Sequence, residues 1–583
     1  MLDESLWMGR PSGIVKDSAL ALSVRHTFYL PMSANERHRH PRSLPLAGIL
    51  AGICFLGGLW NCWRYCYAPD TDEISYLNIG EAFLRGDGSH FLNSTWGPLY
   101  GVVSAAWLSI TPAAYPREAL KVMNLCTLLL VLWGAVALSK RMVRSGRTSL
   151  SVLFTFATLW VCLDVLAVFR ETPDLMLTAV VIASALSYLR LFDDSSNEVG
   201  YRYAVTVGVC GAAGYYLKQS YLPVALLFLV VLAWAPARPG IRILRVIVAG
   251  AAFLVLILPW MAGLSAREGH LTMGGNSKFN YFVNVENQDP IAALFTILPP
   301  QNRLPADPTV VDFGSAYPRS QFPIHFEGAA YLTNVPIHFS WPRELSQVRV
   351  NYIVTLNLFR HKGPFAVLLA LALVAGLCLR KPSFFGPWLP LIAISVTPFI
   401  LYPLVHIEYR YLAPYLFLGA VSTWAWATSE SPNLSPLWAL LIACLLLGGI
   451  LWDTAADLRS TGKAPPGSTS FACCTNPYEV FRERLHAAGV PDGAKIALVG
   501  EPQAEHFYTW LNPGQYRLQA VITDPSRFFA ETPALRQRIE RELSQRGSQV
   551  LLAPQELVPR DQAGDWRPLN IGYMFRLLGT PHA

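Results

Sequence analysis

Charged residues are scarce in this sequence of 583 residues. Only 15% of the residues are Asp, Glu, Lys or Arg, 52% are hydrophobic, and the mean hydropathy is +0.33. Because soluble domains carry about 25% charged residues, this composition predicts an integral membrane protein that also has a soluble part. The net charge of +7 does not indicate nucleic-acid binding, since the basic residues lie in short segments between apolar runs and not in one patch.

Several common motifs are also missing. The cysteines suggest no disulfide framework, because most lie inside apolar runs, and no second Cys or His pair follows Cys473 and Cys474 at zinc-ligand spacing. The strand-like run that begins near Ala494 is not followed by a glycine-rich phosphate loop, which argues against nucleotide binding there. The N-terminal tail is polar and basic, so we expect no cleavable signal peptide.

Long apolar runs dominate the remainder of the sequence. Eleven of them are long enough to span, or nearly span, a lipid bilayer. Backbone polar groups cannot stay unpaired in lipid and no run alternates like a barrel strand, so each run is predicted to be a transmembrane helix. The runs lie at about 45–66, 119–138, 149–168, 174–192, 203–217, 221–235, 243–263, 364–379, 385–404, 411–427 and 437–452.

Lys and Arg residues mark one side of this predicted helical bundle. Alternating the eleven helices places the basic groups of the N-terminal tail and of the short loops on one side, which the positive-inside rule assigns to the cytoplasm. The predicted organisation is a cytoplasmic basic tail (1–44), a transmembrane domain (45–454) with outer loops at about 67–118 and 264–363, and an extracytoplasmic domain (455–583). Both outer loops are rich in Pro and aromatic residues, so we expect interfacial helices in them.

The C-terminal tail has the pattern of a small soluble α/β domain. Ala494–Gly500 reads as a buried strand, and Glu531–Gly547 reads as a helix that has Thr532 as its N-cap and Pro533 at its first position. Two further strand-like runs follow, the second at Tyr573–Leu578. The predicted fold class is therefore a polytopic α-helical membrane protein with a small C-terminal α/β domain.

An acidic pair follows the first predicted membrane helix. Asp72 and Glu73 open a short helix whose apolar positions recur at i, i+3, i+4 and i+7, which predicts a helix lying on the membrane surface. These positions are Tyr76, Ile79, Gly80 and Phe83. A carboxylate held there can accept a proton from a hydroxyl group or bind a divalent cation. The alternative is that both acids only cap the helix in a solvated loop.

Other ionisable residues are predicted on the same outer side. Asp174 begins the fourth predicted helix, Lys218 lies in a very short link between two apolar helices, and Arg410 precedes Tyr411 at another helix edge. A lysine at membrane depth is costly unless it pairs with an anion, and an arginine suits a bidentate hold on phosphate. Helix capping, interfacial anchoring or a structural pair with Glu408 explains each one separately, so a functional site requires that they meet in space.

The order of these motifs resembles the C-type glycosyltransferase (GT-C) superfamily, in particular the branch with protein O-mannosyltransferases and the aminoarabinose transferases of lipid A. The likeness rests on the "DE" pair, the "GD" turn and the "PLY" step in the first outer loop, followed by "TPD", "LKQS" and "EYRYLAPY". It covers about the first 430 residues. The step at Trp96–Pro98 departs from the Lys-Pro-Pro type of the aminoarabinose branch, so it does not define the donor sugar or the acceptor.

The resemblance implies roles for six residues. Asp72 matches the acid that serves as catalytic base or orients the acceptor, sometimes through a divalent metal, and Glu73 matches its partner. Asp174 matches a second acid of the site. Lys218 and Arg410, followed by Tyr411, match positions associated with the phosphate of the lipid donor.

The resulting hypothesis is a membrane glycosyltransferase that moves a sugar from a polyprenyl-phosphate donor to a lipid, glycan or protein acceptor on the outer face, with inversion. A bacterial inner membrane is the expected location, with the C-terminal domain periplasmic. A transporter is the main alternative, although the sequence has no internal repeat and its charges lie at helix ends. A membrane scaffold acting through its outer C-terminal domain is a third interpretation.

Overall fold

The structure of this protein is a computed structural model. Apart from a few isolated positions, the residues that the structure describes are 43–66, 71–111, 116–142, 148–193, 200–288, 302–307, 309–312, 335–361, 386–428, 477–500, 516–569 and 572–579.

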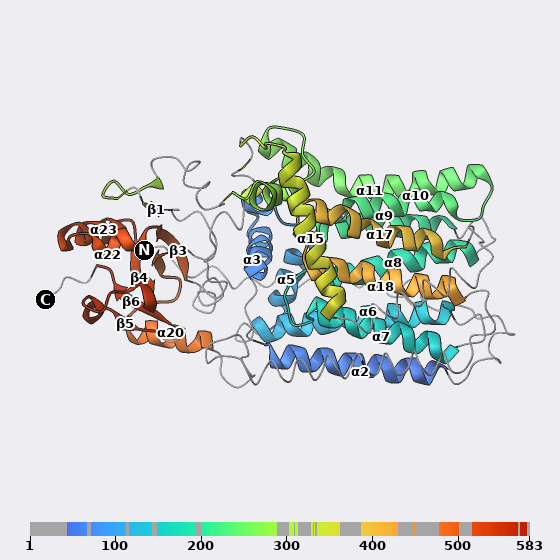
Figure 1. The fold of residues 1–583 in the computed structure, drawn as a ribbon, viewed down its shortest axis with the longest axis horizontal. Coiled ribbons are helices and arrows are strands. Elements are labelled where there is room, and N and C mark those ends of the chain that lie inside the picture. The colour runs from blue at the N-terminus through green and yellow to red at the C-terminus, as the bar shows by residue number, and fades with distance from the viewer. Residues whose placement is uncertain are drawn as a thin grey trace, which may run out of the picture.

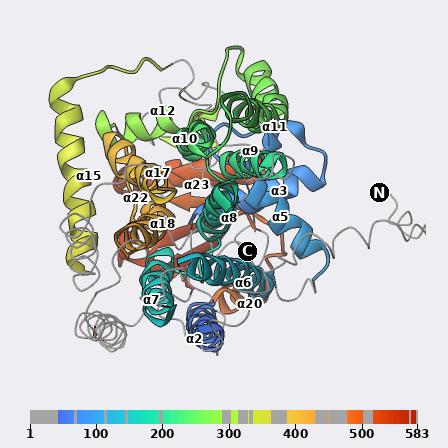
Figure 2. The same ribbon diagram turned by 90° about the vertical axis from the view of Figure 1, so that its right-hand side faces the viewer.

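Nine of the eleven predicted apolar runs lie in the described part of the chain, and each forms a helix. The helices are α2 (Ser43–Arg64), α6 (Pro116–Met142), α7 (Thr148–Leu166), α8 (Asp174–Asp193), α9 (Gly200–Leu217), α10 (Leu222–Val231), α11 (Pro239–Glu268), α17 (Trp388–Leu401) and α18 (Tyr409–Thr428). They lie side by side in one bundle (Figures 1 and 2). The runs predicted at 364–379 and, except for one residue, 437–452 fall outside the described residues.

The bundle has the surface of a membrane protein. Within the described residues, α2, α6, α8 and α11 are long and apolar enough to cross a bilayer. The outward faces of α2 and α11 expose large aliphatic side chains, for example Leu56 (62% exposed) and Val255 (70% exposed). A continuous apolar surface of this kind is stable in lipid and unfavourable in water. The chain is therefore a multi-pass helical membrane protein.

The helix that carries the acidic pair is buried and does not lie on the surface. It is α3 (Thr71–Leu84), which packs along α5 (Pro98–Ser109). A Cβ atom at Gly80 would lie 2.3 Å from the carbonyl oxygen of Gly101, so two glycines allow the backbones to touch. Tyr76 is also buried, which shows that the predicted surface stripe instead packs against protein, although Phe83 remains exposed.

The segment at about 264–363, where we expected interfacial helices, contains a long helix. Helix α15 (Trp341–His361) runs across the direction of the bundle helices (Figure 1). Its Trp341 is exposed, whereas its Asn351 is buried and donates a 2.9 Å hydrogen bond to the carbonyl oxygen of Pro403. This bond fixes α15 to the segment that leads into α18.

An α/β unit lies beyond the end of the bundle that carries α3 (Figure 1). Its six-stranded sheet has the order β1-β3-β2-β4-β6-β5, with β2 parallel to both of its neighbours. The strands are β1 (Val310–Asp312), β2 (Lys495–Val499), β3 (Arg517–Ile522), β4 (Ser548–Pro554), β5 (Arg567–Pro568) and β6 (Tyr573–Leu577), and the helices of this unit are α20 (Pro477–Ala487), α22 (Pro525–Ala530) and α23 (Pro533–Gln545). Thr532 caps α23 by accepting a hydrogen bond from the amide of Leu535, as predicted.

Strand β1 comes from the segment at about 264–363 and not from the C-terminal tail. Val311 pairs antiparallel with Val521 of β3, and the Arg546 guanidinium lies 2.7 Å from an oxygen of Asp312. Ile74 of α3 is buried in the same apolar core as Val311 and the inner face of the sheet. The loop at 264–363 and helix α3 therefore connect the sheet to the end of the bundle where the predicted site residues lie.

Candidate active site

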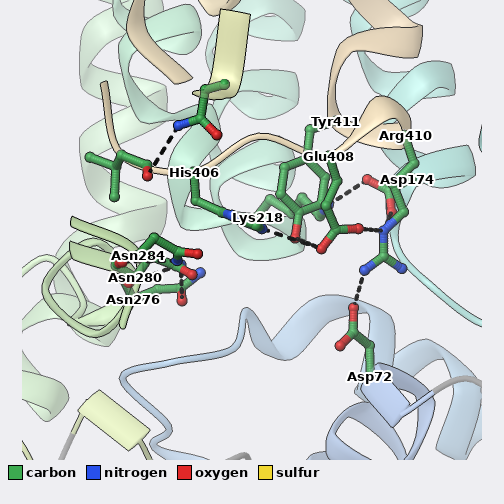
Figure 3. A network of polar contacts seen from close by, with 12 residues as sticks. Asp72, Asp174, Lys218, Asn276, Asn280, Asn284, His406, Glu408, Arg410 and Tyr411 are labelled. Carbon is green, nitrogen blue, oxygen red and sulfur yellow. Dashed lines mark hydrogen bonds and ion pairs between the residues drawn. The ribbon is translucent and has the colours of Figure 1, made fainter. Parts of the chain in front are cut away.

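Five ionisable side chains from four separate segments meet at the end of the bundle that is nearest to the sheet (Figure 3). They are Asp72 at the start of α3, Asp174 at the start of α8, Lys218 in the link after α9, and Glu408 and Arg410 at the start of α18. We call them the outer cluster. Four of them are residues that the sequence had placed in one site, although their positions are as much as 338 residues apart.

Arg410 lies at the centre of the outer cluster. Its Nη2 donates to Oδ2 of Asp72, its Nε donates to Oε2 of Glu408 at 2.6 Å, and the same Nε lies 3.8 Å from Oδ2 of Asp174. A guanidinium presents five N–H donors in a rigid plane, so one arginine can hold three carboxylates in fixed directions. The more compact ammonium group of a lysine lacks this geometry.

Lys218 joins the cluster through Asp174 and Tyr411. Its Nζ lies 2.5 Å from Oδ1 of Asp174 and 3.5 Å from the centre of the Tyr411 ring. The Tyr411 hydroxyl donates to Oε1 of Glu408 at 3.0 Å. The lysine thus has the anion that a buried ammonium requires and also a favourable contact with an aromatic face.

Burial and neighbouring charges oppose each other in this cluster. Burial lowers the pKa of Lys218, which lies in the link outside the membrane spans, although Asp174 opposes this shift. Burial would raise the pKa of Glu408, which precedes α18, but hydrogen bonding from His406 and the charge of Arg410 hold that pKa below its ordinary value. The Glu408 carboxylate is therefore ionised at neutral pH and serves as a fixed negative charge.

A second set of charges lies behind the first. Glu73 lies with its Oε2 3.7 Å from Nη1 of Arg117, and Glu171 forms an ion pair with Lys121. We call these four residues the inner cluster. Their side chains are all at least 92% buried, because no exposed fraction exceeds the 8% of Arg117. Arg117 and Lys121 are both on α6, one helical turn apart.

The two carboxylates of the acidic pair, which the sequence predicted as a possible divalent-cation site, do not face each other. Asp72 points to Arg410, whereas Glu73 is buried beside Arg117, so the two carboxylates take different directions. Among the residues that the structure describes, no three His, Cys, Asp or Glu side chains are grouped so that they could hold a metal ion.

Three asparagines form a row after α11. Asn276, Asn280 and Asn284 follow one another at helical spacing across α12 (Asn276–Asn280) and the π-helical turn Tyr281–Val285. In the view of Figure 3 they are drawn to the left of Lys218 and below His406. The Asn284 Nδ2 donates to the carbonyl oxygen of Asn280 at 2.9 Å, and the Asn280 Nδ2 donates to that of Asn276 at 3.1 Å. Single-turn π-helices are frequent at functional sites.

The arrangement suits proton transfer next to a developing negative charge. Asp72 is the more accessible of the two aspartates, with 22% of its side chain exposed against 1% for Asp174. A partly exposed carboxylate that faces a buried guanidinium can accept a proton from an incoming hydroxyl group. The two cations of the outer cluster, Arg410 and Lys218, can neutralise the charge of a phosphate.

Sequence reasoning identified the outer cluster better than the inner one. The structure brings together Asp72, Asp174, Lys218 and Arg410, and Tyr411 lies against them. Glu73 is the predicted site residue that it turns away. Lys121 lies inside the apolar run predicted at 119–138 and was not singled out, although a lysine in such a run calls for an anionic partner.

Comparison with known proteins supports a fold but not a sequence family. No protein-family model and no curated protein sequence matches this chain. The oligosaccharyltransferase of Archaeoglobus fulgidus in complex with zinc and sulfate aligns with a TM-score of 0.50 at 12% identity, over 88% of this chain and 68% of that chain. The apo form of the same enzyme gives a TM-score of 0.50 at 11% identity, over 88% and 70%.

ArnT of Cupriavidus metallidurans aligns over 92% of this chain and 99% of that chain at 13% identity, but its TM-score of 0.38 is too low to bear on the fold. The fold of this chain is therefore similar to that of the archaeal oligosaccharyltransferase over 88% of this chain.

Proposed function

We propose that this protein is a membrane glycosyltransferase that transfers a sugar from a polyprenyl-phosphate donor to a hydroxyl acceptor on the outer face of the membrane. One observation carries the proposal. The outer cluster joins a partly exposed carboxylate, Asp72, to two buried cations, Arg410 and Lys218, on a fold similar to that of an oligosaccharyltransferase. General base and phosphate-binding groups are what such a transfer requires.

In the proposed reaction Asp72 takes the proton of the acceptor hydroxyl. The acceptor oxygen bonds to the anomeric carbon, the bond from that carbon to the phosphate oxygen breaks on the opposite side, and the electron pair leaves with the lipid phosphate. Configuration at the anomeric carbon is therefore inverted. Arg410 and Lys218 neutralise the charge that develops on the phosphate, in a site of low polarity where such interactions are strong.

The contact between Asp72 and Arg410 couples the two events. In the unliganded protein the Asp72 carboxylate is hydrogen bonded to the guanidinium. When Asp72 becomes protonated it loses its negative charge, so its hold on Arg410 weakens. The positive charge of Arg410 is then available to the leaving phosphate at the moment when that phosphate gains charge. This coupling explains why a base and a cation of the site are in direct contact.

The proposed topology has eleven membrane helices, with the N-terminus in the cytoplasm and the α/β unit on the outer side of a bacterial inner membrane. Helix α6 supports this orientation. Its N-terminal end, with Lys121, lies behind the outer cluster, and its C-terminal end carries Lys140 and Arg141. Basic residues at that second end favour the cytoplasm, which leaves the cluster facing outward. The acceptor is a lipid, a glycan or a protein hydroxyl group.

The test is sugar transfer by the purified protein in detergent, supplied with polyprenyl-phosphate sugars and mixed envelope acceptors. Release of polyprenyl phosphate is followed by mass spectrometry. Asp72→Asn and Arg410→Ala should each lower the rate by at least about 100-fold. The matched control is Glu81→Gln, which removes another carboxylate of α3, one that forms an ion pair with the exposed Arg85, and which should leave the rate unchanged. Parental turnover in Asp72→Asn would refute the proposal.

A further inference from the structure

Each of the two aspartates in the outer cluster has a neighbouring glutamate that points the other way. Asp72 contacts Arg410, and the next residue, Glu73, lies beside Arg117. Asp174 contacts Lys218, and Glu171, three residues earlier, pairs with Lys121. The two segments, far apart in the sequence, therefore have the same arrangement. One acid belongs to the outer cluster, and a second acid lies beside a basic residue of α6.

A single face of α6 holds both segments. Arg117, Lys121 and Asn124 are spaced at i, i+4 and i+7, so their side chains project from the same side of the helix. The Tyr100 hydroxyl of α5 lies 3.5 Å from Oδ1 of Asn124. Helix α6 also crosses the whole bundle, which makes it a rigid support for groups at its end.

Side chains on this face of α6 hydrogen bond to the backbone of the link that precedes Asp174. Three consecutive carbonyl oxygens of the link accept hydrogen bonds from α6: that of Val168 from Asn124 at 2.9 Å, that of Phe169 from Lys121 at 2.5 Å, and that of Arg170 from Asn124 at 2.8 Å. Such a run of carbonyls turned to one side belongs to neither a helix nor a strand.

The start of the same link is strained. Ala167 has a φ of +51°, which is a left-handed conformation that residues other than glycine avoid. A strained backbone persists only where its surroundings fix it more strongly than its own preference opposes it. The surroundings here are the side chains of Lys121 and Asn124 together with the ion pair to Glu171.

We propose that Lys121 and Asn124 are positioning residues, which fix the 167–173 link so that Asp174 meets Lys218 and Arg410 in the geometry of the reaction. The expected effect on turnover rests on the proposed function. The expected effect on the rigidity of the link does not depend on it. Neither residue touches the substrate in this scheme, and both act through Asp174. A displacement of about 1 Å in such a group lowers turnover by about 100-fold.

The test compares Lys121→Met and Asn124→Leu with Lys140→Met, an exposed lysine near the other end of the same helix. Hydrogen–deuterium exchange should show at least about 10-fold faster exchange of the amides from 168 to 176 in the first two variants, and no change in the control. Unchanged exchange in this link would overturn the proposal, whether or not the protein transfers sugar.

Kinetics then separate positioning from general stability. Lys121→Met should lower kcat by about 10-fold to 100-fold while the KM for the lipid donor changes less than about threefold. In the double variant with Asp174→Asn, the loss should equal that of Asp174→Asn alone, because both act through one carboxylate. If the loss of kcat in the double variant equals the product of the losses in the two single variants, Lys121 does not act through Asp174 and the positioning role is overturned. No turnover by the parental protein would instead overturn the proposed function and leave the exchange result to decide this inference.

Discussion

The outer and inner clusters contain the same types of charge but differ in their surroundings and in their pairing. The inner pairs are almost completely buried, with 1% of the Glu73 side chain and none of the Glu171 side chain exposed. In the outer cluster one arginine serves three carboxylates, and Asp72 and Glu408 are 22% and 36% exposed. Partly exposed charges that share one arginine can form new ion pairs with a substrate. Fully buried ion pairs cannot reach a substrate, so their role is to stabilise the fold.

The largest expected difference between the clusters concerns Asp72 and its neighbour. Asp72→Asn should lower sugar transfer by about 1000-fold, since it removes the general base, while the thermal midpoint in detergent stays within about 2 °C of the parental value. Transfer rates and thermal midpoints are measured on the same preparations. A variant with parental activity, or one that loses activity only because it unfolds, would remove the distinction between the clusters.

The complementary substitution tests the inner cluster. Glu73→Gln removes the carboxylate beside the buried Arg117 guanidinium, so the free energy of unfolding should fall by about 3 kcal/mol. The measurement is denaturant unfolding in mild detergent, followed by tryptophan fluorescence. Glu408→Gln, at a partly exposed position of the outer cluster, is the matched control and should cost less than about 1 kcal/mol. Equal losses in both variants would contradict the account.

The geometry of Arg410 can be tested without removing its charge. In Arg410→Lys the positive charge remains, but an ammonium group cannot hold three carboxylates in the directions that the guanidinium fixes. We expect kcat to fall by about 100-fold. If charge alone were sufficient, the lysine variant would retain the parental kcat, and the three-carboxylate arrangement would have no catalytic meaning.

Lys218 should affect binding more than folding. In Lys218→Met the methionine fills a similar volume but cannot pair with Asp174 or a phosphate, so we expect the KM for the lipid donor to rise by about 10-fold. If the inhibition constant of polyprenyl phosphate rises by the same factor, Lys218 acts on the phosphate group of the donor. An unchanged inhibition constant for polyprenyl phosphate would argue against phosphate binding by this lysine.

The smallest expected effect is a pH dependence of stability. The pKa of Glu408 is lowered in the folded protein, so its stabilising contribution is complete above its ordinary pKa of about 4.3 and is lost as the pH falls toward the lower folded value. The difference in thermal midpoint between the parental protein and Glu408→Gln should be constant from about pH 8 to pH 5 and should shrink below. A difference that shrinks as the pH rises would give the opposite sign and contradict the assignment.

Much of the fold followed from the sequence because membrane helices obey a local rule. A run of apolar residues must be helical in lipid, so α8 and α11 were predicted from composition and length alone. The orientation of α3 was not predictable in this way. Its stripe around Tyr76 is equally suited to a membrane surface and to a protein interior, and only the close approach of Gly80 to Gly101 decides for the interior.

The two clusters show the same limit. Asp72, Asp174, Lys218 and Arg410 attract notice in the sequence because charge beside apolar runs is costly and calls for an explanation. The directions of their side chains depend on tertiary contacts, so Asp72 and Glu73 looked like one pair although they face different partners. Strand β1 was missed for a related reason, because its pairing with β3 joins residues that are more than 200 positions apart.

The most direct test of the proposed enzyme is a single-turnover experiment with an isotopically labelled polyprenyl-phosphate sugar and the parental and Asp72→Asn proteins side by side. The parental protein should release one polyprenyl phosphate for each sugar transferred, and the anomeric configuration of the product should be opposite to that of the donor. Asp72→Asn should bind the donor but release no more than about one thousandth as much in the same time. Equal release by the two proteins, or retention of configuration, would contradict the assignment of Asp72 as the base of an inverting transfer.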